Sequence, residues 1–178
     1  MTIVSHGLIR QALRTATAQS HHSVDALFSR FRLDFSFEYG AFLLAHARAL
    51  GAIEPVAKPA SPRLPLITGD LAALGYAMPP ALKFDRRVSE AFRWGLLYAL
   101  EGSRLGGAML ARRVPADLPR SYLLAVHPKG GWAAFQASMD EAGAAGGDGW
   151  LRDAVAGAQA AFALFAAAGA QQDEPANG

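Results

Sequence analysis

The chain has 178 residues, of which 52% are apolar and 18% are charged, with a formal net charge of +2 and no cysteine. This composition is typical of one globular domain with a substantial core, and it excludes an intrinsically disordered chain, disulfide bonds, and catalysis or metal binding by thiolates. The small net charge gives no reason to expect nucleic-acid binding. The sequence shows no apolar run of about 18 residues and no signal peptide at its start, so we expect a cytoplasmic protein with no membrane partner.

Apolar residues recur at helical spacing along most of the chain, and no stretch of strand length alternates between apolar and polar residues. Prolines interrupt the segment 55–65, which predicts a connector, and the glycine-rich run 143–149 predicts a turn. The expected helices, in chain order, are 6–28, 36–53, 66–74, 88–113, 131–142 and 150–168. The sequence therefore predicts an all-α fold with a single domain over residues 1–170, followed by a flexible polar tail at 171–178.

The predicted helix 88–113 carries four glycines between Gly95 and Gly107. Each glycine inside a helix costs roughly 1 kcal/mol relative to alanine, so their presence needs a reason. Gly102 and Gly106 are one turn apart and lie on one face, which they leave without side chains. Two interpretations stay open, namely close packing against another helix or a flat ligand that contacts the helix backbone.

His21 is the candidate metal ligand among the five histidines. It follows Thr17 by one turn on the apolar stripe of the first helix, whereas His22 is rotated by about 100° toward solvent. One turn further on, Asp25 can accept the ring N–H that does not face a metal and so fix the tautomer. Arg14, two turns before His21, can bind a ligand carboxylate. The alternative interpretation is a structural histidine flanked by solvated charges.

Several other kinds of site are absent from the sequence. It contains no three-histidine set, no paired Glu-x-x-His motif, no Gly-x-Ser-x-Gly and no phosphate-binding loop. These absences argue against a di-iron protein, a hydrolase and a nucleotide-dependent enzyme.

Two segments resemble the haem oxygenase family, and most closely its bacterial branch that supplies biliverdin to bacteriophytochromes. They occur in the family's order and separation, and weaker similarities extend over most of the chain. The two segments are Leu13-Arg14-x-Ala16-Thr17-x-x-x-His21-x-x-x-Asp25 and Gly95-x-x-Tyr98-x-x-Glu101-Gly102-Ser103-x-Leu105-Gly106-Gly107. The resemblance implies a helical haem oxygenase-like fold in which haem lies between the first helix and the glycine-bearing helix.

The resemblance also implies roles for individual residues on the proximal side of haem. His21 matches the family's haem ligand, which binds the iron, and Asp25 matches the acidic residue that supports it. Arg14 and Tyr98 match residues near the haem propionates. Because the last helix has no basic residue in its middle, the other candidates for binding the propionates are the pair Arg112-Arg113.

On the distal side, the resemblance assigns Gly102, Ser103 and Gly106 to the catalytic face. The glycines match those that let the helix backbone approach the porphyrin. Ser103 stands where the animal enzymes have an aspartate, so proton delivery is expected to depend on water.

The implied activity is the oxidation of haem, both substrate and cofactor, to biliverdin, carbon monoxide and ferrous iron with O2. Electrons are expected from a ferredoxin or a reductase, since the chain has no flavin or nicotinamide motif, and a bacteriophytochrome is an expected acceptor of biliverdin. The alternative is a haem-binding or haem-sensing protein on the same fold without turnover. A non-haem, thiaminase-like relative has less support because the chain lacks a catalytic cysteine.

Overall fold

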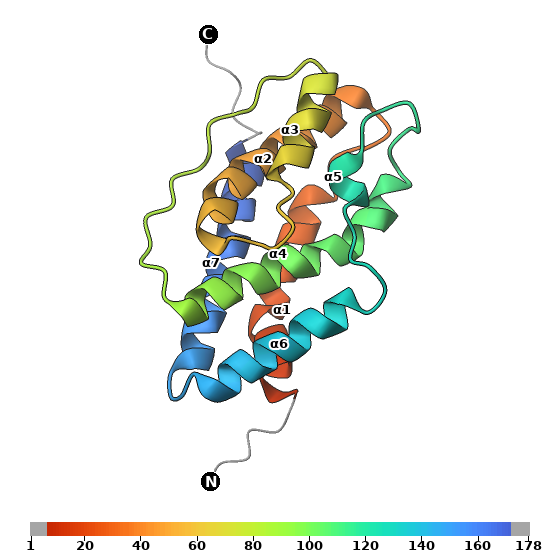
Figure 1. The fold of residues 1–178 in the computed structure, drawn as a ribbon. Helices are drawn as coiled ribbons and strands as arrows, with labels where there is room; N and C mark the ends of the chain where they lie inside the picture. Colours follow the sequence, from red (N-terminus) through yellow and green to blue (C-terminus); the bar gives the residue numbers. More distant parts are fainter. Residues whose placement is uncertain (1–6, 172–178) are drawn as a thin grey trace.

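The computed structural model describes residues 7–171, and this part of the chain is helical with no strand. The predicted all-α class is thus confirmed. Residues 1–6 and 172–178, which hold the start of the predicted domain and nearly all of the predicted tail, lie outside the described residues. In chain order the helices of Figure 1 are α1 (Leu8–Phe28), α2 (Ser36–Ala57), α3 (Leu64–Ala73), α4 (Glu90–Ala111), α5 (Ser121–Leu124), α6 (Gly131–Ala145) and α7 (Trp150–Ala170).

Three helices extend beyond their predicted ends, α7 by only two residues, and α3 begins two residues before its predicted start. α2 continues through Pro55 to Ala57, so the predicted connector at residue 55 begins too early. The proline falls in the last turn, where its missing N–H removes only one helical hydrogen bond. α6 includes Gly143, predicted to start a turn; a Cβ there would lie 2.9 Å from the Ile9 side chain, so the glycine makes room for α1 within a continuing helix.

α5 is a single turn that buried Asp70 of α3 holds in place. The two carboxylate oxygens of Asp70 accept hydrogen bonds from the backbone N–H groups of Ser121 and Tyr122, at 3.1 and 2.8 Å. A carboxylate at a helix N-terminus satisfies donors that have no partner within the helix. The contact joins two segments that are far apart in sequence.

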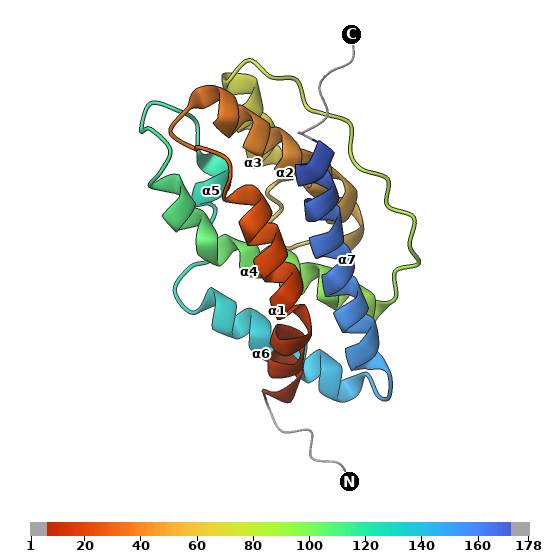
Figure 2. The same ribbon diagram turned by 180° about the vertical axis from the view of Figure 1, so that it is seen from behind.

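α7 is the helix on which the others assemble. It packs most extensively against α4 and also against α1 and α2. Figure 2 shows α1 and α7 side by side, with α4 crossing behind them. α1 packs on α7 and α6 but hardly touches α4, so these two helices face each other across a space.

Glycines bring α4 and α7 into backbone contact. A Cβ at Gly95 would collide with the carbonyl oxygen of Ala154, and a Cβ at Gly157 would collide with that of Phe92. At the other end of α4, a Cβ at Gly107 would collide with the carbonyl oxygen of Leu123. Close helix packing is therefore the correct interpretation for Gly95 and Gly107.

Of the helices in the described part of the chain, α7 is long and apolar enough to cross a membrane, by length and composition. A core helix passes the same test, and α7 packs against three other helices. Its apolar composition is accounted for by this packing.

Replacement of Gly95 by alanine should destabilise the fold by about 1–3 kcal/mol or more, because the added methyl group forces α4 and α7 apart. Gly69→Ala is the matched control, since Gly69 lies in α3 with no atom near its Cβ position. The control should be neutral or more stable by up to about 1 kcal/mol. Chemical denaturation measures both, and equal stabilities of the two variants would contradict the packing role of Gly95.

Candidate functional site

A cavity of about 1130 Å³ occupies the space between α1 and α4. Small-molecule pockets are commonly about 300–1,000 Å³, so this one admits a large ligand. The cavity brings together seven of the residues singled out in the sequence, from two segments about 80 residues apart. The residues in question are Arg14, His21 and Asp25 from α1, and Tyr98, Gly102, Ser103 and Gly106 from α4.

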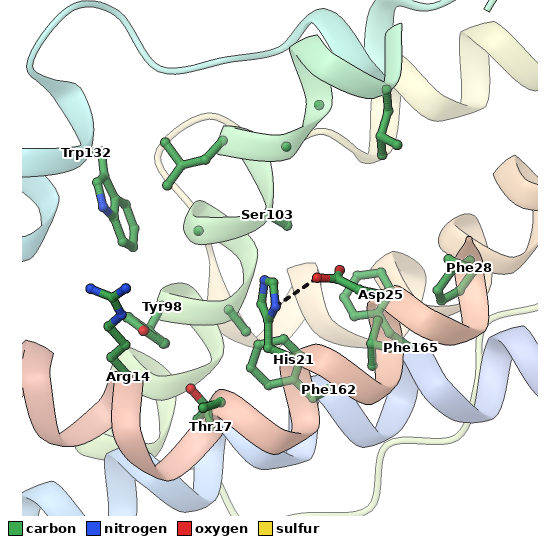
Figure 3. Close-up of a pocket in the computed structure, with 18 of the residues that line it drawn as sticks. Arg14, Thr17, His21, Asp25, Phe28, Tyr98, Ser103, Trp132, Phe162 and Phe165 are labelled. Carbon is green, nitrogen blue, oxygen red and sulfur yellow. Dashed lines mark ion pairs between the residues drawn. The ribbon is translucent and has the colours of Figure 1, made fainter. Parts of the chain in front are cut away.

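His21 rises from α1 toward α4 with its ring oriented by a neighbouring carboxylate (Figure 3). Its Nδ1 lies 3.0 Å from Oδ2 of Asp25, one helical turn away. The edge of the ring also contacts Phe162, with 5.7 Å between ring centroids. When Nδ1–H donates to the carboxylate, the lone pair of Nε2 is left free to bind a metal.

The face of α4 opposite His21 has no side chains at two positions. A Cβ at Gly106 would meet no atom within 4 Å, and one at Gly102 would meet only the Trp132 ring, at 3.5 Å. Both glycines line the cavity. Unlike Gly95 and Gly107, they are therefore not required by helix packing, and they expose backbone to the space in which a ligand would lie.

Between these glycines, the Ser103 hydroxyl is held by a residue that the sequence did not reveal. Its Oγ donates to the carbonyl of Leu100 at 2.7 Å and accepts from the guanidinium of Arg63 at 2.6 Å. Arg63 is only 3% exposed, lines the same cavity, and receives support from Glu54, which accepts its backbone N–H at 2.8 Å. No local signal indicates this role, because Arg63 lies in a proline-rich connector and meets α4 only in the folded chain.

His46 is a second cavity residue not identified from the sequence. Its Nδ1–H donates to the carbonyl of Phe42 at 2.9 Å. The centroid of its ring lies 4.0 Å from the ring centroid of Phe42 and 4.4 Å from that of Phe28. Burial lowers its pKa to about 4, so the ring is neutral near pH 7. Helical spacing did contain a signal here, since His46 follows the inward-facing Phe42 by one turn.

The cavity has a polar side and an apolar side. Figure 3 shows Arg14, Tyr98 and Trp132 on one side and Phe28 and Phe165 on the other. Burial raises the pKa of Tyr98, against smaller opposing contributions from Thr17 and Arg14, so its phenol stays protonated and able to donate. A ligand with acidic groups at one edge would place them on the polar side.

The Arg112-Arg113 pair does not contribute to this polar side, which corrects the expectation from the sequence. Both residues follow the end of α4, and Arg113 donates to the carbonyl of Phe31 at 3.3 Å. Neither lines the cavity, whereas Arg10 does.

Two known proteins are similar to this chain, one in sequence and one in fold. No family model matches the chain. A haem oxygenase from Xanthomonas campestris pv. campestris is 39% identical over 116 residues, which is 58% of this chain and 64% of that protein. The match thus spans slightly less than two thirds of the relative's length. The fold is similar to the solved NO- and CO-bound haem oxygenase of Neisseria meningitidis, with a TM-score of 0.74, 24% identity, and coverage of 96% of this chain and 94% of that one.

The chain is similar in sequence to a haem oxygenase over 58% of its length, and it has the fold of a solved haem oxygenase. Its helical haem oxygenase-like fold is the one predicted from the sequence. Neither relative's description specifies the branch associated with bacteriophytochromes, so that finer assignment stays a prediction.

The neutral state of His46 predicts a pH-dependent stability in this haem oxygenase fold. Its pKa is about 4 in the folded chain, against about 6.5 when unfolded, so below pH 6.5 the unfolded state binds a proton that the folded state does not. Stability should therefore fall as the pH drops from about 6.5 to about 4, by at most ~1.4 kcal/mol per pH unit from this residue.

His46→Gln keeps a neutral hydrogen-bond donor but does not titrate in this range, so its stability should depend less steeply on pH. Urea denaturation of both proteins at a series of pH values measures the difference. Parallel curves for the two proteins would show that His46 is not buried in its neutral form.

Proposed function

We propose that this chain is a haem-degrading monooxygenase that converts haem to biliverdin, carbon monoxide and ferrous iron with O2 and externally supplied electrons. The observation that carries the proposal is that His21, held by Asp25, faces bare helix backbone across a large cavity. Bound haem supplies the iron at which O2 is activated. A single protein ligand to that iron leaves its other axial position open.

On the proximal side, His21 binds the iron through Nε2, while Asp25 holds the ring by its Nδ1–H. The 3.0 Å contact between the two side chains supports this assignment. A fixed tautomer keeps the lone pair of Nε2 directed away from α1. The propionates bind on the polar side of the cavity, at Arg14 and the Tyr98 phenol.

On the distal side, Gly102 and Gly106 let the backbone of α4 lie against the porphyrin. Because these positions lack Cβ atoms, the helix backbone comes close to the porphyrin, and this close approach limits the space in which O2 can lie. Ser103 lines the same space, and Arg63 donates to its oxygen, so the hydroxyl proton is held on the carbonyl of Leu100. The Ser103 oxygen thus presents a remaining acceptor site to an ordered water that carries protons.

We also propose that electrons come from a ferredoxin or a reductase, that a bacteriophytochrome is one acceptor of the biliverdin, and that the protein works in the cytoplasm. These partners follow from the family resemblance. The alternative, a haem-binding or haem-sensing protein without turnover, uses the same cavity and is separated from an enzyme only by a turnover assay.

Purified protein should bind haemin one to one with a Soret band, and His21→Ala should abolish most of that binding because the iron loses its protein ligand. The matched control is His22→Ala, since His22 is adjacent on α1 and exposed but does not line the cavity. Absorbance titration with haemin measures both variants. A wild-type spectrum in His21→Ala would rule out the ligand assignment.

Haemin-loaded protein supplied in air with ascorbate, or with ferredoxin and its reductase, should lose the Soret band and form biliverdin. Gly102→Leu should slow this turnover at least tenfold, because the new side chain fills the distal space. Ala108→Leu is the control, since it adds the same bulk to α4 at an exposed position outside the cavity. Stable haem after prolonged reduction of the wild type would favour the haem-sensing alternative.

A further inference from the structure

A second cavity, of about 530 Å³, lies against the opposite side of α4. Its walls come from the connection between α2 and α3, from α4, from the connection between α5 and α6, and from α6 itself. The two cavities share no lining residue: Gly102 and Ser103 line the first, while the adjacent Glu101 and Arg104 line the second. This second space is therefore separate from the proposed haem site.

The charges at the base of this second cavity are already paired. The buried guanidinium of Arg104 lies 2.9 Å from the carboxylate of Glu101 and also donates to the backbone carbonyls of Ala125 and Ser61. His127 donates from Nε2 to the backbone carbonyl of Glu101 at 2.9 Å. These groups join α4 to the neighbouring connections and leave little capacity for a ligand.

Two further cations, Lys58 and Arg93, line the same cavity without a carboxylate partner among residues 7–171. The polar contact of Arg93 is long, 3.4 Å to the carbonyl of Ala57, and it places the guanidinium beside the residue that precedes Lys58. Arg93 thus contacts the residue next to Lys58 in sequence, and the two cations line one cavity, where their combined charge favours an anion.

The backbone of Lys58 supplies an independent observation. It has a φ of 51° and is the one non-glycine with positive φ in the described part of the chain; the others are Gly7, Gly75, Gly130, Gly147 and Gly149. Glycine is the usual residue at this position after a helix, because a side chain is disfavoured in the left-handed region. A lysine here keeps an ammonium group at the cavity at a cost in stability, as is common at ligand sites.

The remaining wall is apolar and partly aromatic. Leu97 and Phe135 line it, together with Trp94, whose ring packs 5.7 Å from that of Phe135. The indole N–H of Trp94 is buried and has no acceptor among the described residues. Apolar walls with a few polar groups are typical of sites for organic molecules rather than for inorganic ions.

We propose that this second cavity binds an organic carboxylate with a flat, apolar body. The carboxylate lies between Lys58 and Arg93, and the body packs against Leu97 and Phe135. The site is independent of the proposed haem chemistry, because the two cavities share no lining residue.

Naphthalene-2-carboxylate is a suitable probe, and isothermal titration calorimetry measures its affinity for the full chain with and without haemin. We expect the same affinity in both states, because haemin fills only the first cavity. The neutral analogue naphthalene-2-carboxamide should bind at least fivefold more weakly. Arg93→Gln should weaken binding of the carboxylate at least fivefold, whereas Arg86→Gln, at an exposed arginine outside both cavities, should leave it unchanged.

Lys58→Gly removes the ammonium group without destabilising the fold, so a loss of binding in this variant would not result from unfolding. Because glycine suits the left-handed backbone, this variant should unfold at a higher temperature than the wild type and yet bind the carboxylate at least fivefold more weakly. The proposal is overturned if haemin displaces the probe, if the carboxamide binds equally well, if Lys58→Gly and Arg93→Gln keep full affinity, or if the wild type does not bind. Haemin tests the first cavity and naphthalene-2-carboxylate tests the second. Failure of this proposal is therefore distinguishable from failure of the proposed haem function.

Discussion

At Gly95 on α4 and Gly157 on α7, two helix backbones approach so closely that neither position has room for a Cβ. α1 also packs against α7. Both walls of the large cavity, α1 and α4, are therefore positioned by the same central helix. Since α1 and α4 pack on α7 rather than on each other, the space between them stays open. Large side chains at the α4–α7 contact would move one wall relative to the other, which is why the cavity depends on this contact.

The four glycines of α4 divide into two pairs with different physical roles. Gly95 and Gly107 meet backbone atoms of other segments, so their missing side chains permit packing. Gly102 and Gly106 face the cavity, where only the Trp132 ring comes within 4 Å of either Cβ position. The two interpretations left open by the sequence are therefore not exclusive, because one helix uses glycine for packing at its ends and for an exposed backbone face in between.

Buried polar groups connect the wall of the cavity to the rest of the fold. Glu54 accepts the backbone N–H groups of Arg63 and Leu64, and the Arg63 side chain donates to Ser103 and to the carbonyl of Leu100. A buried charge is costly without partners, and these hydrogen bonds supply partners to the Glu54 carboxylate and the Arg63 guanidinium. The result is a serine whose orientation is fixed before any ligand arrives.

Helical periodicity in the sequence was sufficient for the all-α class, for the approximate bounds of the longer helices, and for the contact between His21 and Asp25, because residues one turn apart on a helix are always neighbours. It was also sufficient to place Gly102 and Gly106 on one face. The predicted helix ends at residues 53 and 142, before Pro55 and Gly143, were wrong, because the packing of these helices outweighed the local tendency of proline and glycine to break a helix.

Only the tertiary structure decided which face of α4 meets the cavity, that Arg63 holds Ser103, and that the Arg112-Arg113 pair stays outside. These relations join segments tens of residues apart, and local periodicity carries no information about which distant segments will meet. The positions of side chains within one helix follow from its own geometry, whereas the space between two helices depends on how each packs on a third.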